Sequence, residues 1–92
     1  MHVNFYATLR QVVGAKMVDI PLPTGSTVRH LLAEILRLYP DLRGELLDES
    51  GHLYSHVHIF VSGRDAPFLE NGLDSVISPD DTIGVFPAVG GG

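Results

Sequence analysis

The chain begins with a segment in which every second residue is apolar. In residues 2–8, HVNFYAT, this alternation predicts a strand with one buried face. Residues 16–21, KMVDIP, alternate in the same way, with Val18 and Ile20 directed inward. The residues between them, LRQVVGA, are interpreted as a turn that ends at Gly14, so the two strands are expected to form a hairpin.

The next segment has the spacing of a helix with a single apolar stripe. Its apolar residues recur every three or four positions: Val28, Leu31, Leu32, Ile35, Leu36 and Tyr39. Ser26 or Thr27 can cap the start of this helix, and Pro40 marks its end. Residues 41–49 predict a shorter helical piece that carries Leu42, Leu46 and Leu47.

The second half of the chain predicts further strands separated by turns. Residues 56–63, HVHIFVSG, form a long strand with inward Val57, Ile59 and Val61. The following segments are expected to be a turn (SGRD), a short or edge strand (APFL), a turn with a single helical turn (NGLDSVISPDD) and a last strand (82–86). The last strand directs Ile83 and Val85 inward.

The order of these elements indicates the fold class. One helix with one apolar stripe facing one sheet makes an α+β fold of two layers. A ubiquitin-like β-grasp has this same order: a hairpin, then a crossover helix, then returning strands. We therefore expect a mixed sheet of four to five strands packed on one main helix. Residues 1–87 form this domain, and residues 88–92 form a flexible tail.

Composition removes several classes of function. The 92 residues contain no cysteine, which excludes disulfides, a thiolate nucleophile and zinc–cysteine sites. A net charge of −5 argues against nucleic acid and anionic membranes as main partners. The apolar runs are far shorter than the ~20 residues of a membrane span. The absence of cysteine suits the cytoplasm, where we expect the protein to work.

Candidates for catalysis and metal binding are few. Asp80 and Asp81 form a carboxylate pair, which we interpret as turn residues that bond their own backbone. His56 and His58 would share one face of a strand and could bind a metal, but no third ligand has helpful spacing. We therefore predict no metal site. The segment PTGST lacks the lysine and spacing of a phosphate-binding loop, so we expect no bound cofactor.

The outward positions of the strands carry a more specific feature. Tyr6, His58, Phe60 and Phe86 all fall on the side away from the helix. If the first, third and last strands are neighbours, the three aromatic rings gather into an exposed apolar patch. Such a patch usually marks a site for a partner.

The end of the sequence is its strongest signal. Gly90, Gly91 and Gly92 follow almost directly on the last strand. Glycine lacks a Cβ, so this stretch is thin and extends without steric cost. The five residues after Pro87 reach at most ~17 Å, enough to carry a carboxylate into a narrow channel of another protein.

These segments together resemble the MoaD/ThiS family of ubiquitin-like sulfur carriers. The resemblance covers the whole chain through NFYATLRQVVG, GSTVRHLLAEILRLYP, GHLYSHVHIFVSGRD and GLDSVISPDDTIGVFPAVGGG. The last of these is the most specific, because a strand leads through a proline segment to Gly-Gly. Gly90 stands where many members carry alanine, serine or threonine, and it leaves the terminal pair unchanged.

The resemblance implies a function and a set of partners. In the family, an ATP-using activating enzyme adenylates the terminal glycine, here Gly92, which becomes a thiocarboxylate. The carrier then gives its sulfur to a second enzyme. Recipients in the family include the large subunit of molybdopterin synthase, thiazole synthase, a cysteine synthase and tRNA-thiolating enzymes, and the sequence does not name which one applies. Hydrophobic residues on the exposed sheet face dock the partner. Tyr6 and Phe86 match them by position, and we add Phe60 from the alternation.

Two other functions stay open. One is a β-grasp binding subunit that uses only its sheet face. Such a subunit has no use for a terminal carboxylate. The other is a ubiquitin-like modifier that is conjugated to lysines. A carrier and a modifier share the same activated intermediate, so the sequence does not separate them. In each case the chain is a cosubstrate or subunit and not itself an enzyme.

Overall fold

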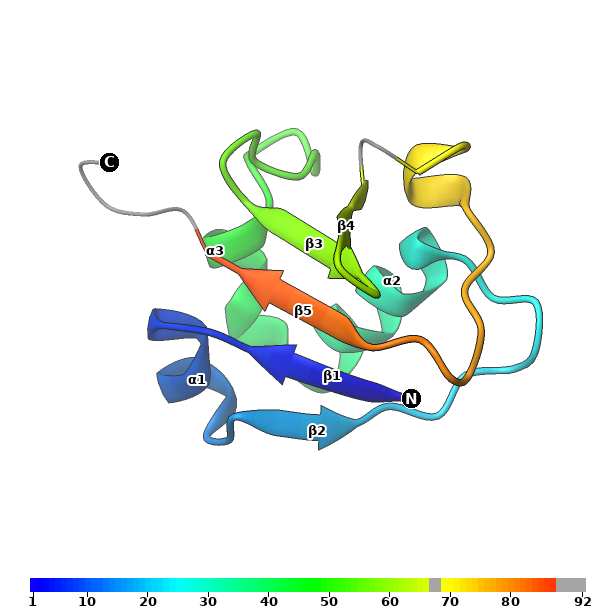
Figure 1. Cartoon of the computed structure of the whole chain (residues 1–92). Coiled ribbons are helices and arrows are strands. Elements are labelled where there is room, and N and C mark those ends of the chain that lie inside the picture. The colour runs from blue at the N-terminus through cyan, green and yellow to red at the C-terminus, as the bar shows by residue number, and fades with distance from the viewer. Residues whose placement is uncertain (67–68, 88–92) are drawn as a thin grey trace.

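The computed structural model describes residues 1–66 and 69–87 of the chain. Five strands form one mixed sheet in the order β2-β1-β5-β3-β4 (Figure 1). Their bounds are β1 His2–Phe5, β2 Met17–Asp19, β3 His58–Val61, β4 Arg64–Asp65 and β5 Ile83–Phe86. β1 and β5 run parallel in the middle of the sheet, and the other pairs are antiparallel. The ubiquitin-like β-grasp fold is therefore confirmed.

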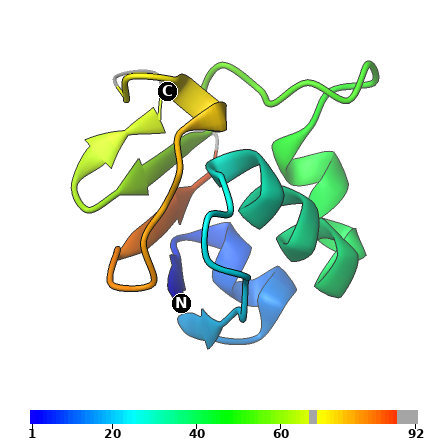
Figure 2. The ribbon, with the colours of Figure 1, turned by 90° about the vertical axis from the view of Figure 1, so that its right-hand side faces the viewer.

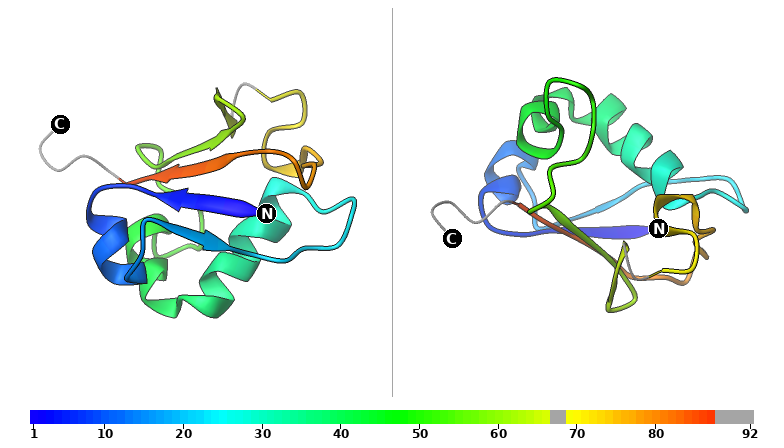
Figure 3. Two further views of the ribbon diagram at one scale, coloured as in Figure 1. Left: turned by 60° about the horizontal axis from the view of Figure 1, so that its bottom comes forward. Right: turned by 90° about the horizontal axis from the view of Figure 1, so that it is seen from above.

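Helices cover one face of this sheet. They are α1 Thr8–Val13, α2 Val28–Leu38, α3 Arg43–Leu46 and the 3-10 turns η1 Pro40–Leu42 and η3 Gly72–Asp74. Seen from the side, α1, α2 and α3 lie in one layer and the strands in the other (Figures 2 and 3). None of these three helices covers the opposite sheet face. The two-layer arrangement predicted from the single apolar stripe is confirmed.

The main helix α2 begins and ends where its sequence indicates. Thr27 caps it, because its Oγ1 accepts a hydrogen bond from the His30 amide at 3.2 Å. The His30 ring nitrogen Nδ1 accepts one in return from the Thr27 amide at 3.1 Å. Val28, Leu31, Leu32 and Ile35 are buried against the sheet. Ser26, the other predicted cap, instead donates to the Pro23 carbonyl.

The core lies between α2 and the inward residues of the central strands. Val3 and Phe5 on β1, Ile59 and Val61 on β3, and Ile83 and Val85 on β5 are all buried, as their alternation predicts. Leu42, Leu46 and Leu47 close one end of this core, so the predicted short helical piece is present as η1 and α3.

The segment after the first strand differs from the prediction. Residues 8–13 form the helix α1 and not a turn, and β1 ends at Phe5. Ala7 has a φ of 53°, which stops the extended strand before residue 8. Leu9, Val12 and Val13 have helical spacing, and Leu9 is fully buried. The two strands still pair antiparallel, with Val3 opposite Val18, but a helix connects them.

The position of the short edge strand was also predicted wrongly. β4 is Arg64–Asp65, within the segment expected to be a turn. The turn itself is Ser62 and Gly63, whose φ values of 48° and 86° suit a two-residue hairpin loop. The strand expected over residues 66–69 is absent at Ala66 and Leu69, and residues 67–68 lie outside the described residues.

Replacement of Ile35 by aspartate should unfold the protein. The Ile35 side chain is only 1% exposed, and an unpaired charge there costs several kcal/mol against a total stability of about 5–15 kcal/mol. Ala33→Asp is the matched control, because Ala33 lies exposed on the same helix. Circular dichroism melting should show a cooperative transition for the control only. A parent-like melt of Ile35→Asp would contradict the two-layer core.

Candidate functional site

The uncovered face of the sheet carries three neighbouring aromatic side chains, which we call the aromatic platform: Tyr6, Phe60 and Phe86, with Phe86 in contact with both others. The Tyr6 and Phe86 rings stack with centroids 4.0 Å apart and planes at 5°. Phe60 meets Phe86 edge to face at 5.2 Å. All three side chains are half-buried. The gathering predicted from strand alternation is therefore present.

Strand order brings these rings together from distant parts of the sequence. Phe86 ends β5, the central strand, which pairs with β1 on one side and β3 on the other. Tyr6 follows β1 directly, and its amide donates to the Val85 carbonyl at 3.2 Å. Phe60 lies on β3, opposite Gly84. The platform is thus built on the three inner strands of the sheet.

Arg10 holds Tyr6 in place, a role that the sequence did not indicate. Its Nε donates to the Phe5 carbonyl at 2.7 Å, and its guanidinium carbon lies 5.2 Å from the centre of the Tyr6 ring. Arg10 reaches this position because α1 turns the chain back beside β1. The Tyr6 ring therefore contacts both the Arg10 guanidinium and the Phe86 ring.

A His–Asp pair flanks the platform. His58 lies opposite Phe86 in the sheet, with its ring 6.0 Å from that of Phe60. Its Nδ1 is 2.7 Å from an Asp65 carboxylate oxygen. His56 lies before β3 and stacks on Tyr54, so the two histidines do not share a strand face. In residues 1–66 and 69–87, no three His, Asp or Glu side chains gather into a metal site.

Asp80 and Asp81 lie in a turn, as predicted, and the Asp81 side chain is the one that bonds its backbone. Asp81 accepts hydrogen bonds from the Ser78 amide at 2.7 Å and from the Ser62 hydroxyl at 2.8 Å. Asp80 donates its amide to the Ser78 hydroxyl. The second of the Asp81 bonds ties this turn to the β3–β4 hairpin.

Shifted pKa values lie away from the platform. The Arg29 guanidinium hydrogen-bonds Asp74 and lowers the pKa of that carboxyl. The N-terminal amine lowers the pKa of Asp19 in the same way. Both carboxylates are exposed partners of surface ion pairs.

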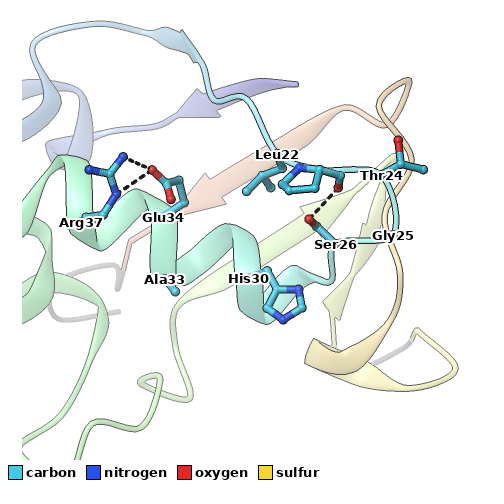
Figure 4. A pocket seen from close by; sticks show the side chains of 9 residues that line it. Leu22, Thr24, Gly25, Ser26, His30, Ala33, Glu34 and Arg37 are labelled. Carbon is cyan, nitrogen blue, oxygen red and sulfur yellow. Dashed lines mark hydrogen bonds and ion pairs between the residues drawn. The ribbon is translucent and has the colours of Figure 1, made fainter.

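A hollow of about 480 Å³ lies on the helix side of the molecule, between α2 and the loop before it (Figure 4). Three of its polar side chains already have hydrogen-bond partners. Glu34 pairs with Arg37, and the Ser26 hydroxyl bonds the backbone of the loop. No set of polar side chains converges there on a common point, so we place the functional site on the platform side.

The platform lies where the chain leaves the sheet. Phe86 is the last residue of β5, and Pro87 after it is buried. Gly90, Gly91 and Gly92 lie outside the described residues. No described helix is long and apolar enough to cross a bilayer.

Arg10→Ala should loosen Tyr6 without unfolding the protein. Loss of the guanidinium removes a cation–π contact of about 0.5–1 kcal/mol and one bond to the backbone. The NMR shifts of the Tyr6 ring protons should move toward those of free tyrosine. Arg43→Ala, on the exposed side of α3, is the control. Tyr6 shifts that match the parent in Arg10→Ala would show that stacking on Phe86 suffices.

The chain matches one known family over nearly its full length. The model of the ThiS family matches residues 3–92. Small archaeal modifier protein 3 of Haloferax volcanii is 33% identical over 92 residues, which are 100% of this chain and 98% of that protein. Sulfur carrier protein CysO of Mycobacterium tuberculosis is 31% identical over 71 residues, which are 75% of each chain.

Two solved structures extend this likeness. A Pyrococcus furiosus protein, described as a candidate molybdopterin converting factor subunit 1, has 32% identity and a TM-score of 0.76, covering 96% of this chain and 95% of its own. CysO of Amycolatopsis orientalis, solved in a complex with BexX, has 26% identity and a TM-score of 0.78, covering 99% and 98%. Carrier and modifier proteins are thus both among the relatives, and none of these four is described as a catalyst.

Proposed function

Because this chain belongs to the ThiS family of small ubiquitin-like proteins, we propose that it is a sulfur carrier whose working group is the carboxylate of Gly92. One observation carries the proposal: the aromatic platform lies at the end of β5, where the chain continues toward the glycine segment. The five residues after Pro87 span at most ~17 Å. A partner that covers the platform therefore has the chain end within that distance of Pro87.

The chemistry proceeds in two steps on the activating enzyme. The Gly92 carboxylate attacks the α-phosphorus of ATP, and pyrophosphate leaves, which produces an acyl adenylate. A sulfide-level sulfur then attacks the carbonyl carbon, and AMP leaves with the electron pair of the broken C–O bond. The product is a thiocarboxylate. ATP is consumed by the partner, and the carrier itself holds no cofactor. We expect both steps to occur in the cytoplasm.

The sulfur recipient that we propose is the large subunit of molybdopterin synthase. The Pyrococcus relative described as a candidate molybdopterin converting factor subunit supports this choice. CysO, in complex with BexX, supports the more general point that such carriers dock on other proteins.

A second function has specific support. The Haloferax relative is described as a modifier protein, and the same adenylate can be attacked by the amine of a lysine. That reaction produces an isopeptide bond in place of a thiocarboxylate. The third possibility, a binding subunit that uses only the platform, has no need of Gly92.

Three changes at the tail should abolish activation and leave the fold intact. Deletion of Gly92 retracts the carboxylate by ~3.5 Å, and a misplacement of ~1 Å can already reduce a rate about 100-fold. An alanine added after Gly92 displaces it outward, and Gly91→Ala introduces a Cβ into a channel built for bare backbone. Each variant should fail to support ATP–pyrophosphate exchange by the activating enzyme. Normal exchange by the Gly92 deletion would favour the binding subunit.

Charges on the platform should weaken docking without unfolding the domain. Tyr6→Glu with Phe86→Glu removes two aromatic anchors, each able to supply ~2 kcal/mol or more at an interface. Calorimetric titration against the activating enzyme should show a large loss of affinity for the double variant. Met17→Glu is the control, because Met17 is 48% exposed on the edge strand β2. Equal binding by the double variant and the control would refute the docking face.

A further inference from the structure

Lys16 is the only lysine of the chain, so it supplies the only side-chain amine. It lies directly before β2, is exposed and forms no ion pair with a described residue. The amine of Met1, by contrast, is held 2.8 Å from a carboxylate oxygen of Asp19. Lys16 therefore carries the amine that is more available to an electrophile.

Strand order places Lys16 at the end of the sheet from which the tail leaves. The Phe5 amide donates to the Lys16 carbonyl at 2.8 Å, and Phe5 lies opposite Val85 on β5. Because neighbouring strands are about 4.8 Å apart, the Cα atoms of Lys16 and Val85 are separated by roughly 10 Å. Figure 1 shows the start of β2 and the end of β5 at the same end of the sheet. Met1 precedes β1, which runs parallel to β5, and so lies at the opposite end.

We propose that Lys16 is an acceptor for the activated Gly92 carboxylate of its own chain, which closes the chain into an isopeptide ring. This rests on the proposed function, because it requires the acyl adenylate. The neutral Lys16 amine attacks the Gly92 carbonyl carbon and forms a C–N bond. AMP leaves with the electron pair of the broken C–O bond, and the nitrogen loses a proton. In the modifier function the amine belongs instead to another protein.

The length of the tail favours a ring over a link between two copies. Seven residues lead from Val85 to Gly92, and they span at most about 25 Å. This is more than twice the separation of roughly 10 Å between the strands that the tail has to cross. A linker this short gives an effective concentration of roughly millimolar. At micromolar protein, Lys16 of the same chain therefore reacts before Lys16 of a second copy.

Ring closure would remove the carrier from sulfur transfer. The ring has no free carboxylate at Gly92, so it can be neither adenylated again nor converted to a thiocarboxylate. Sulfide and the Lys16 amine compete for the same acyl adenylate. Scarce sulfide therefore favours the ring, and abundant sulfide favours the loaded carrier.

The test incubates the full chain at micromolar concentration with the activating enzyme of the source organism and ATP, without a sulfide donor. The intact mass should fall by one water, and digestion should yield a fragment that joins Lys16 to Gly92. Lys16→Arg keeps the positive charge but lacks the amine. This variant should not form the product, and it should still support ATP–pyrophosphate exchange.

A relocated lysine tests whether the position of Lys16 matters. Lys16→Arg combined with Arg64→Lys moves the only lysine to β4. Arg64 is exposed and pairs with Val61, which lies opposite the first residue of β5. The amine is then at the other end of the sheet from the tail. We expect the ring to form about tenfold more slowly or less, because the reacting groups are misplaced.

Other outcomes overturn the proposal in distinguishable ways. A product of two chains less one water means that copies are linked to one another. Loss of water by Lys16→Arg places the bond at another nucleophile, and equal rates for the relocated lysine mean that any exposed amine reacts. If the parent supports pyrophosphate exchange but keeps its mass, the ring falls and the carrier function stands. If the parent supports no exchange, both fall.

Discussion

The parallel pairing of β1 with β5 is the contact on which the rest of the molecule depends. It places Val3, Asn4 and Phe5 beside Ile83, Gly84 and Val85, although about 80 residues separate them in sequence. Parallel neighbours require a long crossover, and the chain between them supplies the whole helical layer. Because both strands run in the same direction, their carboxyl ends meet at one edge of the sheet. Tyr6 and Phe86 therefore stack there, at the start of the tail.

The two faces of the central strands serve different purposes. Inward residues such as Phe5 and Val85 are fully buried under α2 and hold the fold together. Outward residues such as Tyr6 and Phe86 contact one another and stay half-buried. Because side chains alternate along a strand, a slip of one residue would exchange the two sets. The buried core thus fixes the register that also assembles the platform.

Most of the fold and part of the site could be predicted from local patterns. The stripe of α2 and the alternation of β3 and β5 are strong signals, and the same alternation identifies Tyr6, Phe60 and Phe86. The helix α1 was missed because the segment LRQVVGA, which contains a glycine near its end, was interpreted as the turn of a hairpin. The positive φ of Ala7 ends the extended strand, and residues 8–13 form a helix. The role of Arg10 was missed for the same reason, since Arg10 reaches the Tyr6 ring only because residues 8–13 form the helix α1. β4 was misplaced because all four residues of SGRD were assigned to the turn, whereas the loop is only Ser62 and Gly63, and Arg64 and Asp65 already pair with β3.

Gly84 shows a different limit of sequence reasoning. Its outward position follows from parity with Phe86, and a glycine within a strand is itself a signal of close approach. What that glycine faces depends on the Tyr6 ring, which arrives from the other end of the chain. Only the assembled sheet shows that Tyr6, Phe60, Phe86 and Gly84 form one surface.

The central claim is that this domain presents its final carboxylate for conversion to a thiocarboxylate. The most direct test is the intact mass of the full chain after incubation with its activating enzyme, ATP and a sulfide donor. The account predicts a gain equal to the replacement of one oxygen by sulfur, located by fragmentation at Gly92 and dependent on ATP. An unchanged mass, from an enzyme that binds the platform and hydrolyses ATP normally, would contradict it.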